Sequence, residues 1–284
     1  MANILYGKVV ADQATEQLIG RARMLSEKDI EPMLAIVRVG EKGDDLSYER
    51  GALKRAEKIG VRVVVHVLPD DVSQEAVEKE IQMINQDDAI HGCLLFRPLP
   101  RHLDEKKICD MLDSDKDVDG ISSASMASVF MGTGDGFAPC TAEASLAMLN
   151  HYNIPIKGAR AVVIGRSLVI GKPVAMMLLK EHATVTICHT RTLDLPAVTR
   201  DGDIIIACAG KAEMVTADMV VPGQTVIDVG INVTEDGRLT GDVAFDEVEP
   251  IVANISPVPR GVGSVTTTIL MQHVIEAAEQ RMKK

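Results

Sequence analysis

Short apolar runs alternate with longer amphipathic stretches along the chain, and this alternation limits the possible folds more than any other feature. The apolar runs predict buried strands at residues 33–39, 61–67, 92–96, 161–164, 184–188, 203–207 and 225–229. The amphipathic stretches predict helices at residues 11–26, 46–59, 74–84, 103–112, 142–150 and 171–181. Strands that alternate with helices form parallel sheets through right-handed crossovers, and near-continuous apolar strands suit sheets covered on both faces. We therefore expect an α/β fold.

A boundary between two domains is predicted near residues 137–141, where the glycine-rich segment 131–136 ends and a new helix begins. The sequence predicts an N-terminal α/β domain over residues 1–141 and a Rossmann-type dinucleotide-binding domain over residues 142–264. A last helix at residues 265–282 follows a loop rich in proline and glycine. We expect this C-terminal segment, residues 265–284, to return to the first domain.

Composition and charge exclude several classes of protein. Hydrophobic residues make up 46% of the 284 residues and charged residues 25%, as in soluble globular proteins. The apolar runs have strand length and the N-terminus lacks a signal-peptide pattern, so we expect a cytoplasmic protein without membrane segments. The net charge of −11 disfavours nucleic acid and anionic membranes as partners. Five cysteines without a C-x-x-C pair and seven histidines without ligand spacing predict reduced thiols and no metal site.

A candidate phosphate-binding loop follows the strand predicted at residues 161–164. It reads Gly165-Arg-Ser-Leu-Val-Ile-Gly171-Lys-Pro and leads into a helix, which is where a dinucleotide fold places its glycine-rich turn. The match to G-x-G-x-x-G is imperfect, because Ser167 takes the place of the middle glycine. An ordinary strand–turn–helix corner is the alternative interpretation of this segment.

The end of the next predicted strand favours NADP over NAD as the cofactor. A site for NAD ends this strand in Asp or Glu, which binds the ribose hydroxyls, but residues 188–192 contain no carboxylate. Thr190 can donate a hydrogen bond, and Arg191 can pair with a phosphate. Arg166 in the preceding loop can reach the same ribose, and guanidinium groups suit a 2′-phosphate. The alternative is that both arginines are solvated loop residues.

Six segments together resemble the methylenetetrahydrofolate dehydrogenase/cyclohydrolase family. They are Asp115-Lys-Asp-Val-Asp-Gly120, Pro139-Cys-Thr141, Val162-Val-Ile-Gly-Arg-Ser167 with Gly171 and Pro173, Val226-Ile-Asp-Val-Gly-Ile-Asn232, Gly241-Asp-Val243 and Pro257-Val-Pro-Arg-Gly-Val-Gly263. They occur in the family's order and spacing and span nearly the whole chain. The resemblance implies two domains with the active site in the cleft between them, a tetrahydrofolate derivative as substrate, and a homodimer joined through the cofactor domains.

The resemblance also assigns residues to the site where the folate binds. It implies that Tyr48 and Asp119 are the catalytic and substrate-binding side chains. The family's catalytic lysine lies four residues after the tyrosine, where this chain has Ala52, and the lysine's glutamine partner corresponds to Phe96. Lys54 lies about 200° around the helix from Ala52, and the guanidinium of Arg55 stays protonated, so neither replaces the lysine as a base.

Two further groups of residues come from the resemblance. The loop Pro257-Val-Pro-Arg-Gly261 implies substrate binding by Pro257, Pro259 and Gly261, with Arg260 in a position that is usually glycine in the family. The nicotinamide side of the cofactor site is implied to include Ala209, Gly210 and Ile231.

The family's two reactions make different demands on the protein. The dehydrogenase moves a hydride from the one-carbon bridge between N5 and N10 of the folate to nicotinamide C4, which mainly requires donor and acceptor to be aligned. Hydrolysis of the resulting cation requires general acid–base help. We therefore expect an NADP-dependent methylenetetrahydrofolate dehydrogenase that lacks the hydrolytic activity. A fully bifunctional enzyme and a folate- or nucleotide-binding protein without catalysis are the alternatives.

Overall fold

The computed structural model describes residues 1–234 and 237–282, and the chain divides into two compact units. The six-stranded unit consists of Met1–Asp12 and Thr141–Thr266, and the three-stranded unit consists of Gln13–Cys140 with the described residues from Thr267 onward. The expected two-domain α/β architecture is confirmed. One difference concerns the first twelve residues, which were expected in the first domain. They belong to the six-stranded unit, because strand β1 (Asn3–Ile4) pairs in parallel with β11 (Asn254–Ile255).

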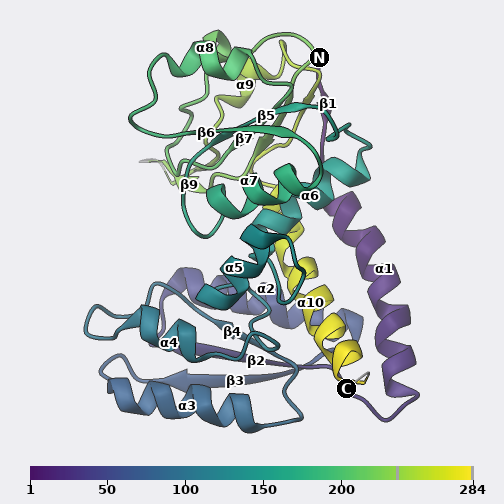
Figure 1. Cartoon of the computed structure of the whole chain (residues 1–284), viewed down its shortest axis with the longest axis vertical. Coiled ribbons are helices and arrows are strands. Elements are labelled where there is room, and N and C mark those ends of the chain that lie inside the picture. Colours follow the sequence, from purple (N-terminus) through teal and green to yellow (C-terminus); the bar gives the residue numbers. More distant parts are fainter. Residues whose placement is uncertain (235–236, 283–284) are drawn as a thin grey trace. The chain divides into compact units, whose positions relative to one another are not determined.

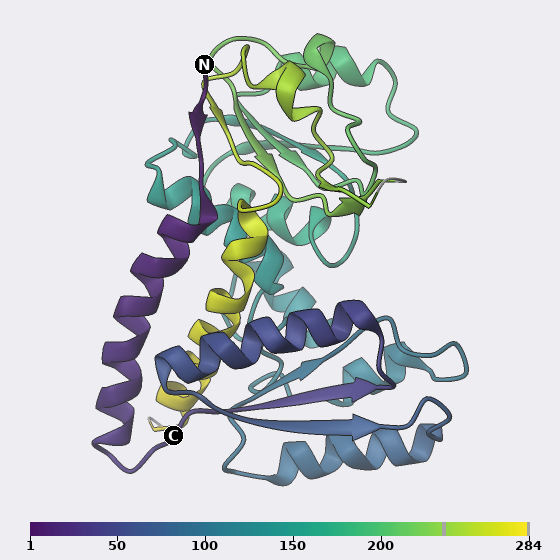
Figure 2. The same ribbon diagram turned by 180° about the vertical axis from the view of Figure 1, so that it is seen from behind.

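The six-stranded unit contains a parallel sheet in the order β1-β11-β8-β7-β5-β6. Its other strands are β5 (Arg160–Ile164), β6 (Thr184–Cys188), β7 (Ile204–Ala207) and β8 (Thr225–Asp228). Helices α6 (Cys140–His151) and α7 (Gly171–Lys180) lie on one face, and α8 (Leu195–Arg200) and α9 (Phe245–Val248) lie on the other (Figures 1 and 2). Strands β5, β7 and β8 are almost wholly buried, which explains why their central residues are apolar on both faces of the sheet.

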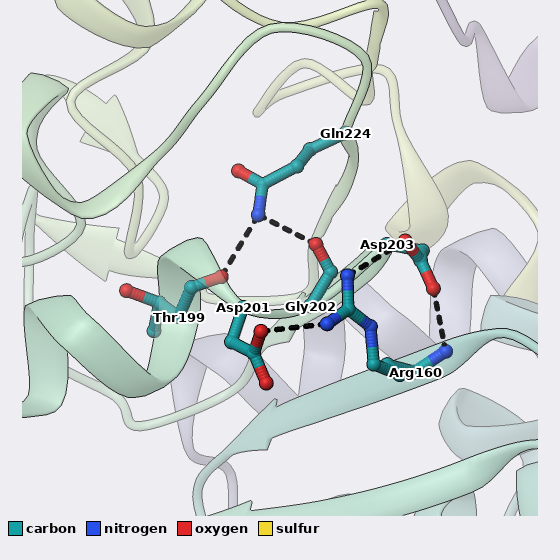
Figure 3. A network of polar contacts seen from close by, with 6 residues as sticks. All are labelled: Arg160, Thr199, Asp201, Gly202, Asp203 and Gln224. Atoms are coloured by element: carbon teal, nitrogen blue, oxygen red, sulfur yellow. Dashed lines mark hydrogen bonds and ion pairs between the residues drawn. The ribbon is translucent and has the colours of Figure 1, made fainter.

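A polar network fixes the starts of three of these strands (Figure 3). The backbone N–H of Arg160, at the start of β5, donates to Oδ2 of Asp203 at 2.7 Å, just before β7. The buried amide of Gln224, just before β8, donates to the carbonyl oxygens of Thr199 and Gly202 at 2.8 and 2.7 Å. These contacts lie at the amino-terminal ends of the strands. They fix the strands at the edge of the sheet opposite the loops that follow β5 and β7.

The three-stranded unit contains a parallel sheet in the order β3-β2-β4, formed by β2 (Met33–Val39), β3 (Arg62–Leu68) and β4 (Gly92–Leu95). Helices α3 (Gln74–Gln86) and α4 (Glu105–Met111) pack on one face, and α2 (Gly43–Ile59) and α10 (Thr266–Arg281) pack on the other (Figures 1 and 2). Every residue of the central strand β2 is buried. This burial explains why seven consecutive residues show no polar alternation.

The remaining elements include α1 (Gly7–Ser26), which matches the helix predicted at residues 11–26, and several that were not predicted. The latter are α5 (Ser123–Met131), the antiparallel pair β9 (Asn232–Val233) and β10 (Leu239–Thr240), and the 3₁₀ turns Ala217–Met219 and Val262–Ser264. Within the described residues, we find no helix that combines the length and the apolar character needed to cross a membrane.

A buried lysine supports the turn that carries Asp119. Lys116 is 1% exposed, and its ammonium group donates to the backbone carbonyls of Ile84, Asn85 and Asp87 at the end of α3. These carbonyls are at the negative end of the helix dipole, where a cation is favourable. Lys116 therefore joins the turn at residues 113–120 to α3 and limits the freedom of the segment that follows.

Candidate active site

The loop after β5 closes tightly against neighbouring backbone. Gly165 has a φ of +137°, and a Cβ at this position would lie 2.3 Å from the carbonyl oxygen of Cys208. A Cβ on Gly171, the first residue of α7, would lie 2.4 Å from the carbonyl oxygen of Gly165. The turn therefore requires glycine at both positions, and it brings these two predicted cofactor residues together.

Ser167, between the two glycines, caps α7. Its hydroxyl accepts hydrogen bonds from the N–H groups of Ile170 at 3.1 Å and Gly171 at 3.4 Å. The side chains of Arg166 and Ser167 are exposed on the same loop. The loop therefore presents a cation and a hydroxyl at the start of a ten-residue helix, an arrangement that suits an anionic group.

The turn after β6 carries the other predicted cation. The N–H of His189 donates to Oγ1 of Thr192 at 2.9 Å, and the N–H of Arg191 donates to Nδ1 of His189 at 3.1 Å. These bonds hold the turn from within, and they leave the side chains of Thr190 and Arg191 exposed. Residues 188–192 include no carboxylate that would repel a phosphate.

The positions of these loops fit a dinucleotide with a 2′-phosphate. Strand β5 lies between β6 and β7, so the chain adds β6 on one side of β5 and then crosses to add β7 on the other side. Ligands of such sheets bind at the point where the strand order reverses. At the end of β7, Gly210 has a φ of +66°, and a Cβ there would meet no atom within 4 Å. The exposed arginines and the open space beside Gly210 are compatible with NADP.

Asp242, which the sequence analysis did not assign to the site, organises the loop after β7. It is fully buried, and its carboxylate accepts hydrogen bonds from the N–H groups of Ala209 (2.5 Å), Gly210 (2.9 Å) and Lys211 (2.9 Å). It also accepts one from the side-chain amide of Asn232 at 2.9 Å. One carboxylate therefore fixes the loop after β7 and the segment after β8 relative to each other.

Asp228, at the end of β8, is a second buried carboxylate beside Asp242. It accepts hydrogen bonds from the N–H groups of Gly230, Asp242 and Val243, each at 3.0 Å. Burial raises the pKa of Asp228 to about 7, and the nearby charge of Asp242 acts in the same direction, while the three N–H donors oppose both effects. An aspartate that ends an apolar strand, as in Val226-Ile-Asp-Val229, is the sequence signal that could have identified this residue.

A cavity of about 260 Å³ in the six-stranded unit is lined in part by Asp228. It is lined by the predicted substrate residues Pro257, Pro259 and Gly261 and by Ile231 from the predicted nicotinamide side, so the fold brings these four together. Arg260 also lines the cavity and has a φ of +83°, which is a strained conformation for a residue other than glycine. Its side chain is exposed.

In the three-stranded unit, Tyr48 lies on α2 and contacts Phe96 at the end of β4. The two rings meet edge to face with their centroids 5.8 Å apart. Ala52, one helical turn after Tyr48, is fully buried. The positions that correspond to the family's lysine and glutamine therefore hold an apolar pair, which can neither hold nor transfer a proton.

Asp119 lies in the same unit and is half-buried. Burial raises the pKa of its carboxyl group above the ordinary value, whereas hydrogen bonds from the thiol and the N–H of Cys140 and the positive charge of Arg97 act to lower it. Cys140 is itself buried, and its thiol also contacts the carbonyl oxygen of Val118 at 3.3 Å. The carboxylate is thus held on one side by Cys140 and has a cation nearby.

The two basic residues that follow Ala52 on α2 do not take over the position of the lysine. The side chain of Lys54 is exposed. The guanidinium of Arg55 donates to the hydroxyl of Thr15 on α1 at 2.8 Å. Residue Arg55 therefore joins two helices of the three-stranded unit.

Nothing in the described part of the chain resembles a metal centre, because no three His, Cys, Asp or Glu side chains gather as ligands there. The five cysteines are all buried, and none of them forms a disulfide.

Comparisons with known proteins cover both parts of the chain. Residues 5–119 match the model of the catalytic domain of tetrahydrofolate dehydrogenase/cyclohydrolase, and residues 139–282 match the model of the NAD(P)-binding domain of the same family. The bifunctional protein FolD of Carboxydothermus hydrogenoformans is 53% identical over 281 residues, which cover 98% of each chain.

Solved structures agree with this assignment. The bifunctional FolD enzyme of Campylobacter jejuni superposes with a TM-score of 0.97 and 37% identity, over 99% of this chain and 100% of that one. The Trypanosoma brucei FolD dehydrogenase-cyclohydrolase, in complex with NADP and an inhibitor, superposes with a TM-score of 0.94 and 32% identity, over 100% and 99% of the two chains. The chain therefore belongs to the tetrahydrofolate dehydrogenase/cyclohydrolase family.

Proposed function

We propose that the protein oxidises 5,10-methylenetetrahydrofolate to 5,10-methenyltetrahydrofolate with NADP⁺ as the hydride acceptor, and that it does not hydrolyse the product. Membership of the family supports the dehydrogenase activity, as does the NADP in the complex of the Trypanosoma brucei relative. The observation that carries the second part is the buried pair Ala52 and Phe96, at the positions where the family has its lysine and glutamine.

The six-stranded unit supplies the cofactor site in this proposal. Arg166 and Arg191 bind the 2′-phosphate, and the glycine turn at residues 165–171 lets the backbone approach the pyrophosphate. Asp242 holds Ala209 and Gly210 in place on the nicotinamide side through hydrogen bonds to their N–H groups. NADP, when bound, supplies nicotinamide C4 as the acceptor of the hydride.

The three-stranded unit supplies contacts to the folate. Asp119 accepts hydrogen bonds from the N–H donors of the pterin ring, and Tyr48 packs against the ring system with Phe96 behind it. Hydride transfer requires no proton to leave in that step, so positioning by these side chains is sufficient.

Hydrolysis would require a group that activates water and assists breakdown of the adduct. Ala52 and Phe96 cannot do this, Lys54 is exposed, and Arg55 is engaged with Thr15. The apolar pair favours release of the methenyl product without hydrolysis.

We also propose a homodimer joined through the six-stranded units. Strand β6 is an edge strand of its sheet, with Ile187 36% exposed, and Leu179 on the adjacent α7 is 53% exposed. A location in the cytoplasm is supported by five cysteines that form no disulfide.

One experiment tests the proposed function. Purified protein is given methylenetetrahydrofolate with NADP⁺ and then with NAD⁺, while the absorbance of the reduced nicotinamide and of the methenyl product is followed separately. The proposal predicts equal accumulation of both products and a higher kcat/KM with NADP⁺. Reduced nicotinamide without accumulation of the methenyl compound would indicate a bifunctional enzyme, and no turnover with either cofactor would indicate a binding protein.

A further inference from the structure

Arg97 is a half-buried cation that lies on a fixed loop beside Asp119. The N–H of Phe96 donates to the carbonyl of Val37 at 2.9 Å, and Lys42 donates to the carbonyl of Pro98 at 2.6 Å. The backbone is therefore held on both sides of Arg97, so its side chain leaves the main chain from a well-defined position.

The guanidinium of Arg97 has no hydrogen bond or ion pair with any residue that the structure describes. It is close enough to Asp119 to lower the pKa of that carboxyl group, yet the two groups do not form an ion pair. It also lies near the buried thiol of Cys109, whose pKa it acts to lower against the larger effect of burial. A half-buried cation and a half-buried carboxylate thus lie near each other without direct contact.

An arginine that serves only as a solvated loop residue would have an exposed side chain, unlike the half-buried Arg97. Arg101, four residues further on, is an example of that kind, because its side chain is exposed. Partial burial removes hydration from the guanidinium of Arg97, and this cost is offset when a ligand supplies an acceptor. Asp119 offers acceptors only and Arg97 offers donors only, so a ligand that contacts both needs a donor next to an acceptor.

We propose that Arg97 determines specificity for the ring of the substrate, by donating to a ring carbonyl oxygen while Asp119 accepts from the adjacent ring N–H and amino groups. The ligand class is a 2-amino-4-oxo pyrimidine edge, which presents an acceptor next to two donors. This inference rests on the proposed function, because it takes the tetrahydropterin ring as the ligand. Arg97 is a binding residue and does not touch the reacting carbon.

The test compares the wild type with Arg97→Leu, Arg97→Lys and the matched control Arg101→Leu. KM and kcat are measured with methylenetetrahydrofolate, and Kd is measured by calorimetry with folic acid, an unreactive 2-amino-4-oxopteridine. Arg97→Leu should raise KM and Kd about 10- to 100-fold, the range expected for loss of a hydrogen bond from a charged donor, while the Kd for NADP stays constant. Arg97→Lys should lie between, because it keeps the charge but loses the planar fork, and Arg101→Leu should behave as the wild type.

The pH dependence separates a contact with the ligand from an effect through Asp119. Arg97, Asp117 and Cys140 are the groups that influence the Asp119 carboxyl, and removal of Arg97 raises its pKa. A purely electrostatic effect would therefore disappear as the pH rises and Asp119 is ionised in both proteins. A direct contact leaves the loss of binding unchanged as the pH rises.

Three results would overturn the proposal. They are a folic acid Kd that is unaffected by Arg97→Leu, a defect that disappears at the higher pH, and a wild type that does not bind folic acid. These outcomes are distinguishable from failure of the proposed function. A wild type without dehydrogenase activity whose folic acid binding still depends on Arg97 would refute the function and leave the assignment of Arg97 intact.

Discussion

Replacing Asp242 with asparagine should destabilise the protein and weaken NADP binding. Asp242 is fully buried and accepts hydrogen bonds from three backbone N–H groups and from the amide of Asn232. Each carboxylate oxygen accepts two of these bonds. In asparagine one oxygen becomes an NH₂ group, so two of the four donors lose their acceptor and face another donor.

The magnitude follows from these two donors. A buried donor left without a partner costs about 1–3 kcal/mol, which gives about 2–6 kcal/mol for two. Loss of the charge next to the buried carboxyl of Asp228 removes a repulsion and offsets part of this cost. We therefore expect the free energy of unfolding to fall by about 2–4 kcal/mol. The Kd for NADP should rise, because Ala209 and Gly210 lose their common anchor.

Urea unfolding at neutral pH measures the change in stability, and calorimetric titration measures the Kd for NADP. Asp246→Asn is the matched control, because Asp246 is exposed and lies four residues away on the same segment. If Asp242→Asn unfolds at the same urea concentration as the control and binds NADP equally well, the assigned role of Asp242 is wrong.

Three other perturbations test separate parts of the account. Replacing Arg166 and Arg191 together with leucine should weaken NADP binding by about 2–4 kcal/mol and leave NAD binding nearly unchanged, as measured by calorimetry; an equal loss for both cofactors would contradict the 2′-phosphate assignment. Burial raises the pKa of Asp228 to about 7, above its value of about 4 in an unfolded chain. The contribution of Asp228 to the free energy of unfolding is therefore fully present below about pH 4 and is lost as the pH rises through 7. Urea titrations should therefore show that Asp228→Asn gains stability relative to the wild type between about pH 5 and about pH 8, and a difference that does not change with pH would oppose this. The double change Ala52→Lys with Phe96→Gln should restore more hydrolysis of methenyltetrahydrofolate than the two single changes add up to, because an ammonium needs a polar partner; simple additivity would show that the positions do not act as a pair.

The sequence predicts the long elements of this fold well, because their hydrophobic periodicity is strong. Strands β2 and β6 have the predicted limits, and the other predicted strands and helices differ from the structure by a few residues at their ends. Helix α5 was not predicted, since Ser123–Met131 alternates small polar and apolar residues without a clear helical stripe. Its N-cap Ser122 and the left-handed Gly132 after its end were the available signals. Strand β1 has two residues and a partner 251 positions away, which no local pattern can show.

The candidate site was predicted less completely than the fold. The glycine turn was visible as a motif, because Gly165 and Gly171 are required by backbone packing. Asp242 and Lys116 were not assigned as supports, because charged residues in loops are usually solvated, whereas here both are buried by long-range contacts with backbone groups. Arg97 was also missed, because its relation to Asp119 depends on how β4 and the turn at residues 113–120 lie in the unit.

The most direct test of the central claim follows added methenyltetrahydrofolate in the presence of the wild-type protein. The same preparation is first shown to reduce NADP⁺ with methylenetetrahydrofolate, so that an inactive sample is excluded. The account predicts that the methenyl compound then decays at the rate seen in buffer, because Ala52 and Phe96 provide no acid–base group. Decay well above the buffer rate, in proportion to the concentration of the protein, would contradict the account and show that another group performs the hydrolysis.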